Sequence, residues 1–500
     1  MKTRFKFLFA VACMSLLFAC NKSELVTEDL SGVDLKSASI KHGEVFLVTP
    51  NGVDDTQALI DAFNLARAAG RGSIVQLTEG QFTIGMIEIR DFYGYFLGAG
   101  IDKTTVTNLS DITPDGLVAL NKLPALITFI GGDITASDLS VKLSEGLSWL
   151  GTQEMNMLLF SDYSADFMPA KQHIGVNLSN VEVDGVLQKN VELWPDGPIL
   201  DFPYANICGV KFAYDILAPL PNTLITRSNI DASVSNCKFS NFQKGTFVWG
   251  CKQGNFNFGT EGGNIYTGNN QGLCINENIG LNVKIENNKF TITDYKWNGI
   301  DLNTGAAAFG TDPFEKVQGE VGVYEIRNNI FDIYIYGSGF GVMDAWRYTH
   351  PDNPSWMKII CDNNTFNALG EGAVVGQNYS MKNALFSKNT IAGSALNGFW
   401  PNTGLYWIGP DDPNYLLTWS EGCKFLNNKF LQKDMVFFAD MDTKDFLVMG
   451  DLSNVIVQDN GVNNKFIGKT NPGHSNLKSA VNPMSRLERI RKMHSNQFGQ

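Results

Sequence analysis

The chain has 500 residues, with 39 basic and 51 acidic side chains and a formal net charge of −12. A hydrophobic share of 44% with only 18% charged residues excludes a disordered chain. The acidic balance, without long Lys or Arg runs, argues against nucleic acid as a partner. The 48 Asn beside 49 Gly are an unusually large share, which is typical of many short strands joined by tight turns.

The first residues have the pattern of a bacterial export signal. A positive start from Lys2 to Lys6 precedes an apolar run over 7–18, which is too short to span a bilayer as a finished helix. The string Leu17-Phe18-Ala19-Cys20 then resembles a lipobox, which implies cleavage before Cys20 and lipidation of its thiol. The alternative is an ordinary signal peptide followed by an incidental Cys.

The segment after Cys20 is polar and lacks apolar periodicity, so it reads as a tether. Its acidic residues resemble the stretch that sends some Bacteroidetes-type lipoproteins to the cell surface. We therefore expect a signal peptide at 1–19, a lipidated tether at 20–42 and one domain at 43–500. The expected location is the cell envelope, with the lipid in the outer membrane.

The other cysteines of the mature chain indicate neither a metal site nor a disulfide pattern. They show no C-x-x-C and no His at ligand spacing. We interpret most of them as small buried apolar residues. They are Cys208, Cys237, Cys251, Cys274, Cys361 and Cys423.

An amphipathic helix is predicted near the start of the domain. Apolar residues recur at helical spacing from Ala58 to Ala69, Asp54 is placed to cap the helix with Gln57 three residues later, and Gly70 is placed to end it. Short strands and the turn Gly98-Ala99-Gly100 follow. This order resembles the N-terminal part of the pectate-lyase-like right-handed parallel β-helix superfamily, in which a short helix caps the first coil. The resemblance implies that Asp54-Asp55 belongs to the helix cap and is not a catalytic pair.

A repeated turn motif supports a solenoid independently. Asn tolerates the left-handed backbone of a tight bend, its amide can bond to the copy one coil above, and the Phe two residues later points inward. Close copies begin at Asn287, Asn328, Asn363, Asn427 and Asn463, and weaker ones at Asn236, Lys388 and, less clearly, Leu178. Stacked copies predict a solenoid. The 25 residues from Phe366 to Ile391 predict the bare coil, and the 51 from Phe239 to Phe290 leave room for two.

The predicted fold class is therefore all-β: a right-handed, single-stranded parallel β-helix with an N-terminal capping helix and a C-terminal helix. The C-terminal helix is expected around Ser485 to His494, where a capping-box string opens a basic amphipathic pattern. We expect it to cover the open edge of the last coil.

The second strand after each Asn-Asn turn, which often opens with Gly, carries the candidate site. In Gly299–Asn303, alternation turns Ile300 and Leu302 inward and Asp301 and Asn303 outward. Loop insertions are expected after this strand, at 304–319, 344–356 and 403–419. Because coils stack about 4.8 Å apart, these loops should rise along one face.

Aromatic and polar residues concentrate in this part of the chain. Six of the nine Trp residues lie between 297 and 419. Exposed rings beside amides and carboxylates suit stacking on sugars, although loop aromatics can also serve only to pack loops against the solenoid. The substrate-binding candidates are Trp346, Trp400, Trp407, Asn303 and Asn402, and the catalytic candidates are Asp301, Asp344, Arg347 and His350.

The sequence favours no single reaction. Polygalacturonase-type and pectate-lyase motifs such as Gly-His-Gly and Arg-x-Pro-x-x-Arg are absent from the middle coils. Hydrolysis needs carboxylates about 5–5.5 or 6.5–9.5 Å apart, whereas strand geometry puts Asp301 and Asp344 roughly 11 Å apart. A lyase needs a base and a group that neutralises a substrate carboxylate, which Arg347 and His350 would provide.

We interpret the chain as an envelope lipoprotein that acts on polysaccharide, with a glycosidase preferred to a lyase. The alternative is a non-catalytic surface glycan-binding or adhesin-like β-helix protein. We expect a monomer. The sequence indicates no metal or other cofactor, and it neither predicts nor excludes calcium.

Overall fold

The structure is a computed structural model, and it describes the middle of the chain with gaps. The described residues are 43–109, 124–144, 155–162, 173–185, 207–213, 229–276, 278–292, 298–303, 319–334, 338–343, 355–369, 374–379, 381–393, 399–402, 420–433, 435–439 and 443–470. They belong to one compact unit, Gly43–Gln500. Cys20 and the expected C-terminal helix lie outside the described residues. None of the described helices is long and apolar enough to cross a membrane.

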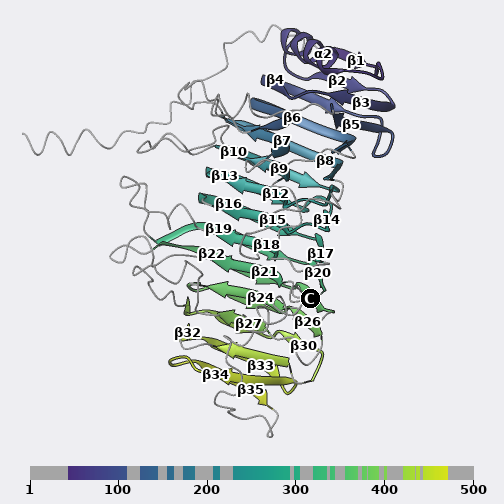
Figure 1. Ribbon diagram of the computed structural model, residues 1–500. Coiled ribbons are helices and arrows are strands. Elements are labelled where there is room, and N and C mark those ends of the chain that lie inside the picture. The colour runs from purple at the N-terminus through teal and green to yellow at the C-terminus, as the bar shows by residue number, and fades with distance from the viewer. Residues whose placement is uncertain are drawn as a thin grey trace, which may run out of the picture. The chain divides into compact units, whose positions relative to one another are not determined.

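The fold is the expected right-handed parallel β-helix, in which successive coils pair in parallel along three sheets (Figure 1). Three long strands bend from one sheet into the next: β4(Ile87–Leu97), β6(Ala125–Lys142) and β8(Ile174–Asp184). The short pair β28(Ser420–Glu421) and β32(Thr443–Lys444) stands apart from the sheets.

Sheet 1 runs through the whole unit. Besides parts of the three long strands it contains β1(Val45–Val48), β2(Ser73–Leu77), β10(Ile230–Ser235), β13(Lys252–Phe258), β16(Ile279–Glu286), β19(Gly319–Arg327), β22(Ser355–Asp362), β25(Leu385–Ser387), β29(Lys424–Leu426), β33(Leu447–Leu452) and β35(Lys465–Thr470).

Sheet 2 follows sheet 1 in each coil, and sheet 3 follows sheet 2. Sheet 2 adds β3(Gly80–Ile84), β5(Thr104–Asn108), β11(Lys238–Ser240), β14(Ile265–Thr267), β17(Lys289–Ile292), β20(Ile330–Ile333), β23(Thr365–Ala368), β26(Thr390–Gly393) and β30(Lys429–Phe430). Sheet 3 adds β7(Met155–Ser161), β9(Ile207–Phe212), β12(Lys244–Trp249), β15(Gln271–Asn276), β18(Asn298–Asn303), β21(Ser338–Met343), β24(Val374–Tyr379), β27(Phe399–Asn402), β31(Met435–Ala439) and β34(Val455–Asp459).

The capping helix is α2(Thr56–Ala69), at the purple end of Figure 1. It buries Leu59, Ala62, Phe63 and Ala66, and the Phe63 ring packs edge-on against Phe92 at 5.1 Å. The expected capping box is absent, because the Asp54 carboxylate accepts the Thr56 N–H at 2.9 Å while Gln57 donates to Asp61. The pair is structural, as the resemblance implied: Asp55 is buried and accepts the backbone N–H groups of Asn51 and Thr83.

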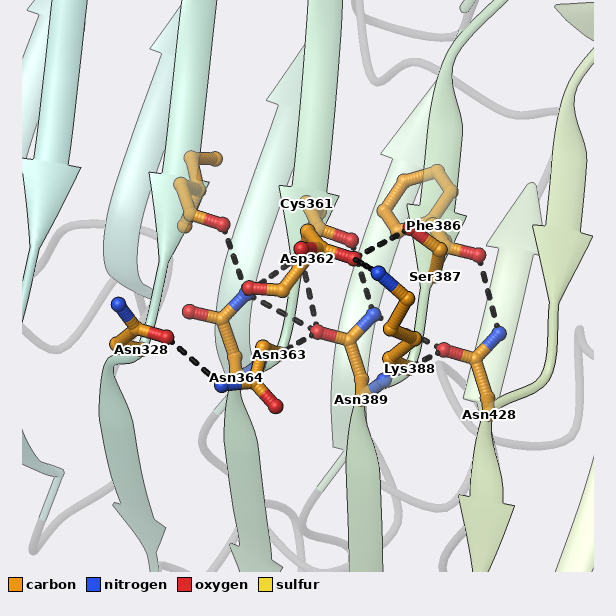
Figure 2. A network of polar contacts seen from close by, with 11 residues as sticks. Asn328, Cys361, Asp362, Asn363, Asn364, Phe386, Ser387, Lys388, Asn389 and Asn428 are labelled. Carbon is orange, nitrogen blue, oxygen red and sulfur yellow. Dashed lines mark hydrogen bonds and ion pairs between the residues drawn. The ribbon is translucent and has the colours of Figure 1, made fainter.

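The Asn motif forms the turn from sheet 1 to sheet 2. Its first residue has a positive φ, for example 62° at Asn287 and 57° at Asn328. Its second residue is buried and joins an amide ladder, in which each Nδ2 donates to Oδ1 of the next coil at 2.9–3.0 Å. The ladder consists of Asn264, Asn288, Asn329, Asn364, Asn389 and Asn428, and Figure 2 shows its last three members.

The inward aromatic residue of each copy stacks on its neighbours. Ring centroids from Phe239 through Tyr266, Phe290 and Phe331 to Phe366 lie 4.6–5.0 Å apart. Tyr266 and Asn264 belong to a coil without an Asn-Asn-x-Phe string, which confirms that the 51-residue gap holds two coils. The prediction for Asn463 was wrong in place: it has φ 57° but lies in the turn before β35 of sheet 1.

In several sheet 3 strands the first inward-facing residue is glycine, because a side chain there would clash with the next coil. A Cβ on Gly272 would lie 2.6 Å from the Gly299 carbonyl oxygen and 2.9 Å from the Phe290 ring. A Cβ on Gly299 would meet Gly339 in the same way. These strands therefore turn Gly and the following residue inward together, and the residues on either side, such as Gln271 and Cys274, project outward.

Candidate functional site

The outer face of sheet 3 presents Asp301 as the sequence predicted. Ile300 and Leu302 are fully buried, whereas Asp301 between them is half-buried. The insertions expected after this strand lie mostly outside the described residues. Two of the insertions end slightly earlier than expected: β19 begins at Gly319, within the predicted insertion 304–319, and β22 begins at Ser355, within the predicted insertion 344–356.

Strand register places Asp301 and Trp400 in one row of the sheet. Asp301 pairs with Gly341, which pairs with Gln377, which pairs with Trp400. The two positions are three coils apart, or about 14 Å along the stack. Of the other strand candidates, Asn303 pairs with Asn276 and Met343, and Asn402 pairs with Ala439 beyond an irregularity in register.

The remaining candidates lie outside the described residues. They are Asp344, Trp346, Arg347, His350, Trp407 and the lipidation residue Cys20. Their convergence with Asp301 stays a prediction.

The described contacts of Asp301 come from β15, one coil earlier. Gln271 Nε2 donates to Asp301 Oδ2 at 2.8 Å, and Cys274 Sγ lies 3.8 Å from the same oxygen. Sequence reasoning did not find these two residues. The available signal was that Gln271 and Cys274 stand on either side of the inward pair Gly272-Leu273, and therefore both face outward.

A second feature missed from the sequence is a pair of lysines on the same face. Lys211 is 2% exposed, and its Nζ lies 4.7 Å from the Phe247 ring centre and 4.5 Å from the Trp249 ring centre. Lys244 contacts the same ring, with its Nζ 4.5 Å from the Phe247 ring centre. A lysine between the buried Val210 and Phe212 was the signal in the sequence, because a strand position flanked by core residues faces outward.

The row that contains Asp301 holds few carboxylates among the described residues. Running toward the N-terminus from Asp301, its members are Cys274, Phe247, Lys211, Leu159, Thr128 and Glu88. Glu88 is six coils from Asp301, about 29 Å by strand spacing. This separation is far beyond the range that glycoside hydrolysis requires.

Among the described residues, the outer face of sheet 3 carries neither a metal-binding group nor a histidine. No group of three His, Cys, Asp or Glu side chains among the described residues is arranged to hold a metal ion. The described histidine, His173, is on the sheet 1 side and pairs with Asp231 at 2.7 Å. Burial opposes the ionisation of Asp231, but the hydrogen bonds from Asn255 and His173 outweigh it and lower the pKa of that carboxyl.

The described cysteines confirm the interpretation made for most of them. All six are buried, and Cys237, for example, lies among core residues. Burial raises the pKa of the Cys237 thiol to about 12.

No protein-family model matches the chain, and no curated protein sequence matches it. Solved structures do resemble it. A mannuronan C-5 epimerase A-module of Azotobacter vinelandii is 13% identical, with 82% of this chain and 96% of that chain covered and a TM-score of 0.42. A family 28 exopolygalacturonase of Yersinia enterocolitica is 9% identical, with 85% and 79% covered and a TM-score of 0.48. The Streptococcus pneumoniae surface protein and adhesin PfbA is 14% identical, with 80% and 97% covered and a TM-score of 0.37.

These similarities assign no reaction, since identities of 9–14% reflect backbone architecture alone. The chain has the right-handed parallel β-helix architecture that its N-terminal motifs and Asn repeats predicted.

Proposed function

We propose that the protein is an envelope lipoprotein that acts on a polysaccharide along the outer face of sheet 3. The observation that carries the proposal is the row in which Asp301 and Trp400 are in register three coils apart. A row with a carboxylate, an amide and an aromatic residue on coils about 4.8 Å apart suits a linear polymer, because different coils offer contacts to different sugars along it.

The reaction that we favour is glycoside hydrolysis, with lyase chemistry second. Asp301 is the described carboxylate in the central part of this face, and it is held by Gln271. Hydrolysis requires a second carboxyl group, which we assign to Asp344. The assignment requires the 344–356 insertion to fold back toward Asp301, since strand geometry alone leaves the two roughly 11 Å apart. In a lyase, His350 would take the proton and Arg347 would neutralise the carboxylate of the substrate. Trp346, Trp407, Asn303 and Asn402 are the proposed sugar contacts.

A non-catalytic glycan-binding protein is the second candidate. The observation in its favour is that the described part of the Asp301 row has no carboxylate nearer than Glu88. A face that offers hydrogen bonds and rings, without paired carboxylates, binds sugars but does not cleave them.

The test is a glycan panel followed by analysis of the products. Asp301→Asn is close to isosteric, so it should preserve binding and abolish turnover if the carboxylate is catalytic. Asp332→Asn is the matched control, because Asp332 is a half-buried carboxylate of sheet 2 that pairs with Lys289. Trp400→Ala should weaken binding by removing a stacking surface.

Each outcome separates the candidates. Loss of products in Asp301→Asn alone supports an enzyme. Binding without products by the wild type, unaffected by Asp301→Asn, supports the non-catalytic candidate. Full binding by Trp400→Ala together with full turnover by Asp301→Asn would show that sheet 3 is the wrong face.

A further inference from the structure

Asp301 is held from the preceding coil by two groups on one oxygen. Gln271 Nε2 donates to Oδ2 at 2.8 Å, and Cys274 Sγ lies 3.8 Å from that oxygen. Gln271 precedes the inward Gly272 of β15 and Cys274 follows the inward Leu273, so both project outward beside Asp301. The contacts span 30 and 27 residues of sequence, and only the stacking of coils brings them together.

Both contacts favour one ionisation state. An amide nitrogen donates and does not accept, and a thiol is a weak donor. Donors that converge on a carboxylate oxygen stabilise its ionised form, whereas half-burial disfavours the charge. A bond to an ionised acceptor is roughly twice as strong as a neutral one, so the Gln271 donor favours the ionised carboxylate over the neutral acid.

The other described groups along this face act in the same direction. The register neighbours of Asp301 on either side are Cys274 and Gly341, and neither carries a negative charge that would oppose ionisation. Lys244 pairs with Gln271 one coil further on, and it brings the nearest described cation along that row. Strand geometry puts the Lys244 and Asp301 backbones roughly 14 Å apart, so this cation stabilises the charge only modestly.

We infer that Gln271 and Cys274 are positioning residues that keep Asp301 ionised, so that Asp301 acts as a base or nucleophile and another group supplies the proton. The role in a reaction rests on the proposed function. The ionisation state does not, since it follows from contacts present without any substrate.

The ionisation state is measured first, on the full chain without ligand. We would record carbon-13 NMR of protein labelled at the aspartate carboxyl, with Asp301→Asn identifying the Asp301 signal. Asp301 should titrate below the ordinary Asp value of about 3.9. Gln271→Leu should raise the midpoint by about one pH unit, and Cys274→Ala should raise it by less.

Two further variants make this test sharp. Gln271→Glu keeps the size of the side chain and adds a negative charge, so it should raise the Asp301 midpoint even if Gln271→Leu folds poorly. Gln76→Leu is the matched control, because that amide bonds to the carbonyls of Leu97 and Gly98 in the first coils. A wild-type midpoint above the ordinary value, or no rise in both Gln271 variants, would overturn the inference.

Activity gives a second and separable readout. On a glycan that the wild type cleaves, the acidic limb of kcat/KM should move up in Gln271→Leu by the same amount as the NMR midpoint. An unchanged limb beside a shifted midpoint would refute the role as base or nucleophile. If no glycan is cleaved, the proposed catalysis fails while the NMR titration still decides whether Gln271 and Cys274 hold Asp301 ionised.

Discussion

The buried amide ladder should make a large and position-dependent contribution to stability, and Asn364 tests it best. Asn364 Oδ1 accepts the N–H and the Nδ2–H of Asn329, both at 2.9 Å. Its Nδ2 donates to the Ile326 carbonyl at 2.8 Å and to Asn389 Oδ1 at 3.0 Å (Figure 2). Asn364→Ala would remove these four bonds, and two longer ones from Nδ2 to Cys361 Sγ and the Asp362 carbonyl, from a residue that is 1% exposed.

The magnitude follows from the groups left behind. The Asn329 N–H and the Ile326 carbonyl would stay buried without these partners, and each such group costs roughly 1–3 kcal/mol. The second Asn329 amide bond is lost as well, so we expect Asn364→Ala to lower the free energy of unfolding by about 3–5 kcal/mol. Asn464→Ala should cost only about 1–2 kcal/mol, because Asn464 is partly exposed and water can replace its bonds to Phe446, Thr443 and Asp459.

Urea unfolding followed by circular dichroism measures the difference. Asn363→Gly is the matched control, because glycine keeps the positive φ of 56° and only the exposed bond to Asn328 is lost. That variant should stay within about 0.5 kcal/mol of the wild type. Equal losses for Asn364→Ala and Asn464→Ala would refute the reasoning, since they would mean that each Asn serves only its local turn.

Three further expectations are independent of the ladder. Lys388 has φ 53° at the turn position that Asn fills in neighbouring coils. Lys388→Asn should therefore raise the free energy of unfolding by about 0.5–1 kcal/mol, after allowing for the loss of the weak ion pair with Asp362. A lower free energy in urea unfolding would contradict this expectation. Burial raises the pKa of Cys237 to about 12 from an ordinary 9.0, so this thiol stabilises the fold below pH 9 and that contribution is lost as the pH rises from 9 to 12; the urea midpoint should fall over this range less in Cys237→Ala than in wild type. A fatty acid analogue should label wild type but not Cys20→Ala, and equal labelling would exclude lipidation at that residue.

Local patterns in the sequence determined the repeating unit. Asn-Asn-x-Phe predicts a tight turn with an inward ring because Asn accepts positive φ and Phe seeks burial, and Asn287 to Phe290 does both. The helix of the first coil was equally readable, since its apolar spacing alone gives the face that buries Phe63. The outward direction of Asp301 followed from strand alternation in the same way.

Only the tertiary structure decided where each unit stands in the coil. The string at Asn463 encodes a turn conformation but not which corner it forms, and the pairing of β35 with β33 sets that corner. The coil with Asn264 and Tyr266 lacks both the Asn-Asn pair and the Phe of the motif, and it is recognised by the stacking of Tyr266 between Phe239 and Phe290. Gln271 and Cys274 meet Asp301 because one coil of 27 residues sets Cys274 beside Asp301 and brings Gln271, three residues earlier on the same strand, within reach. Their partner depends on coil length and register, which are properties of the whole stack and not of any local pattern.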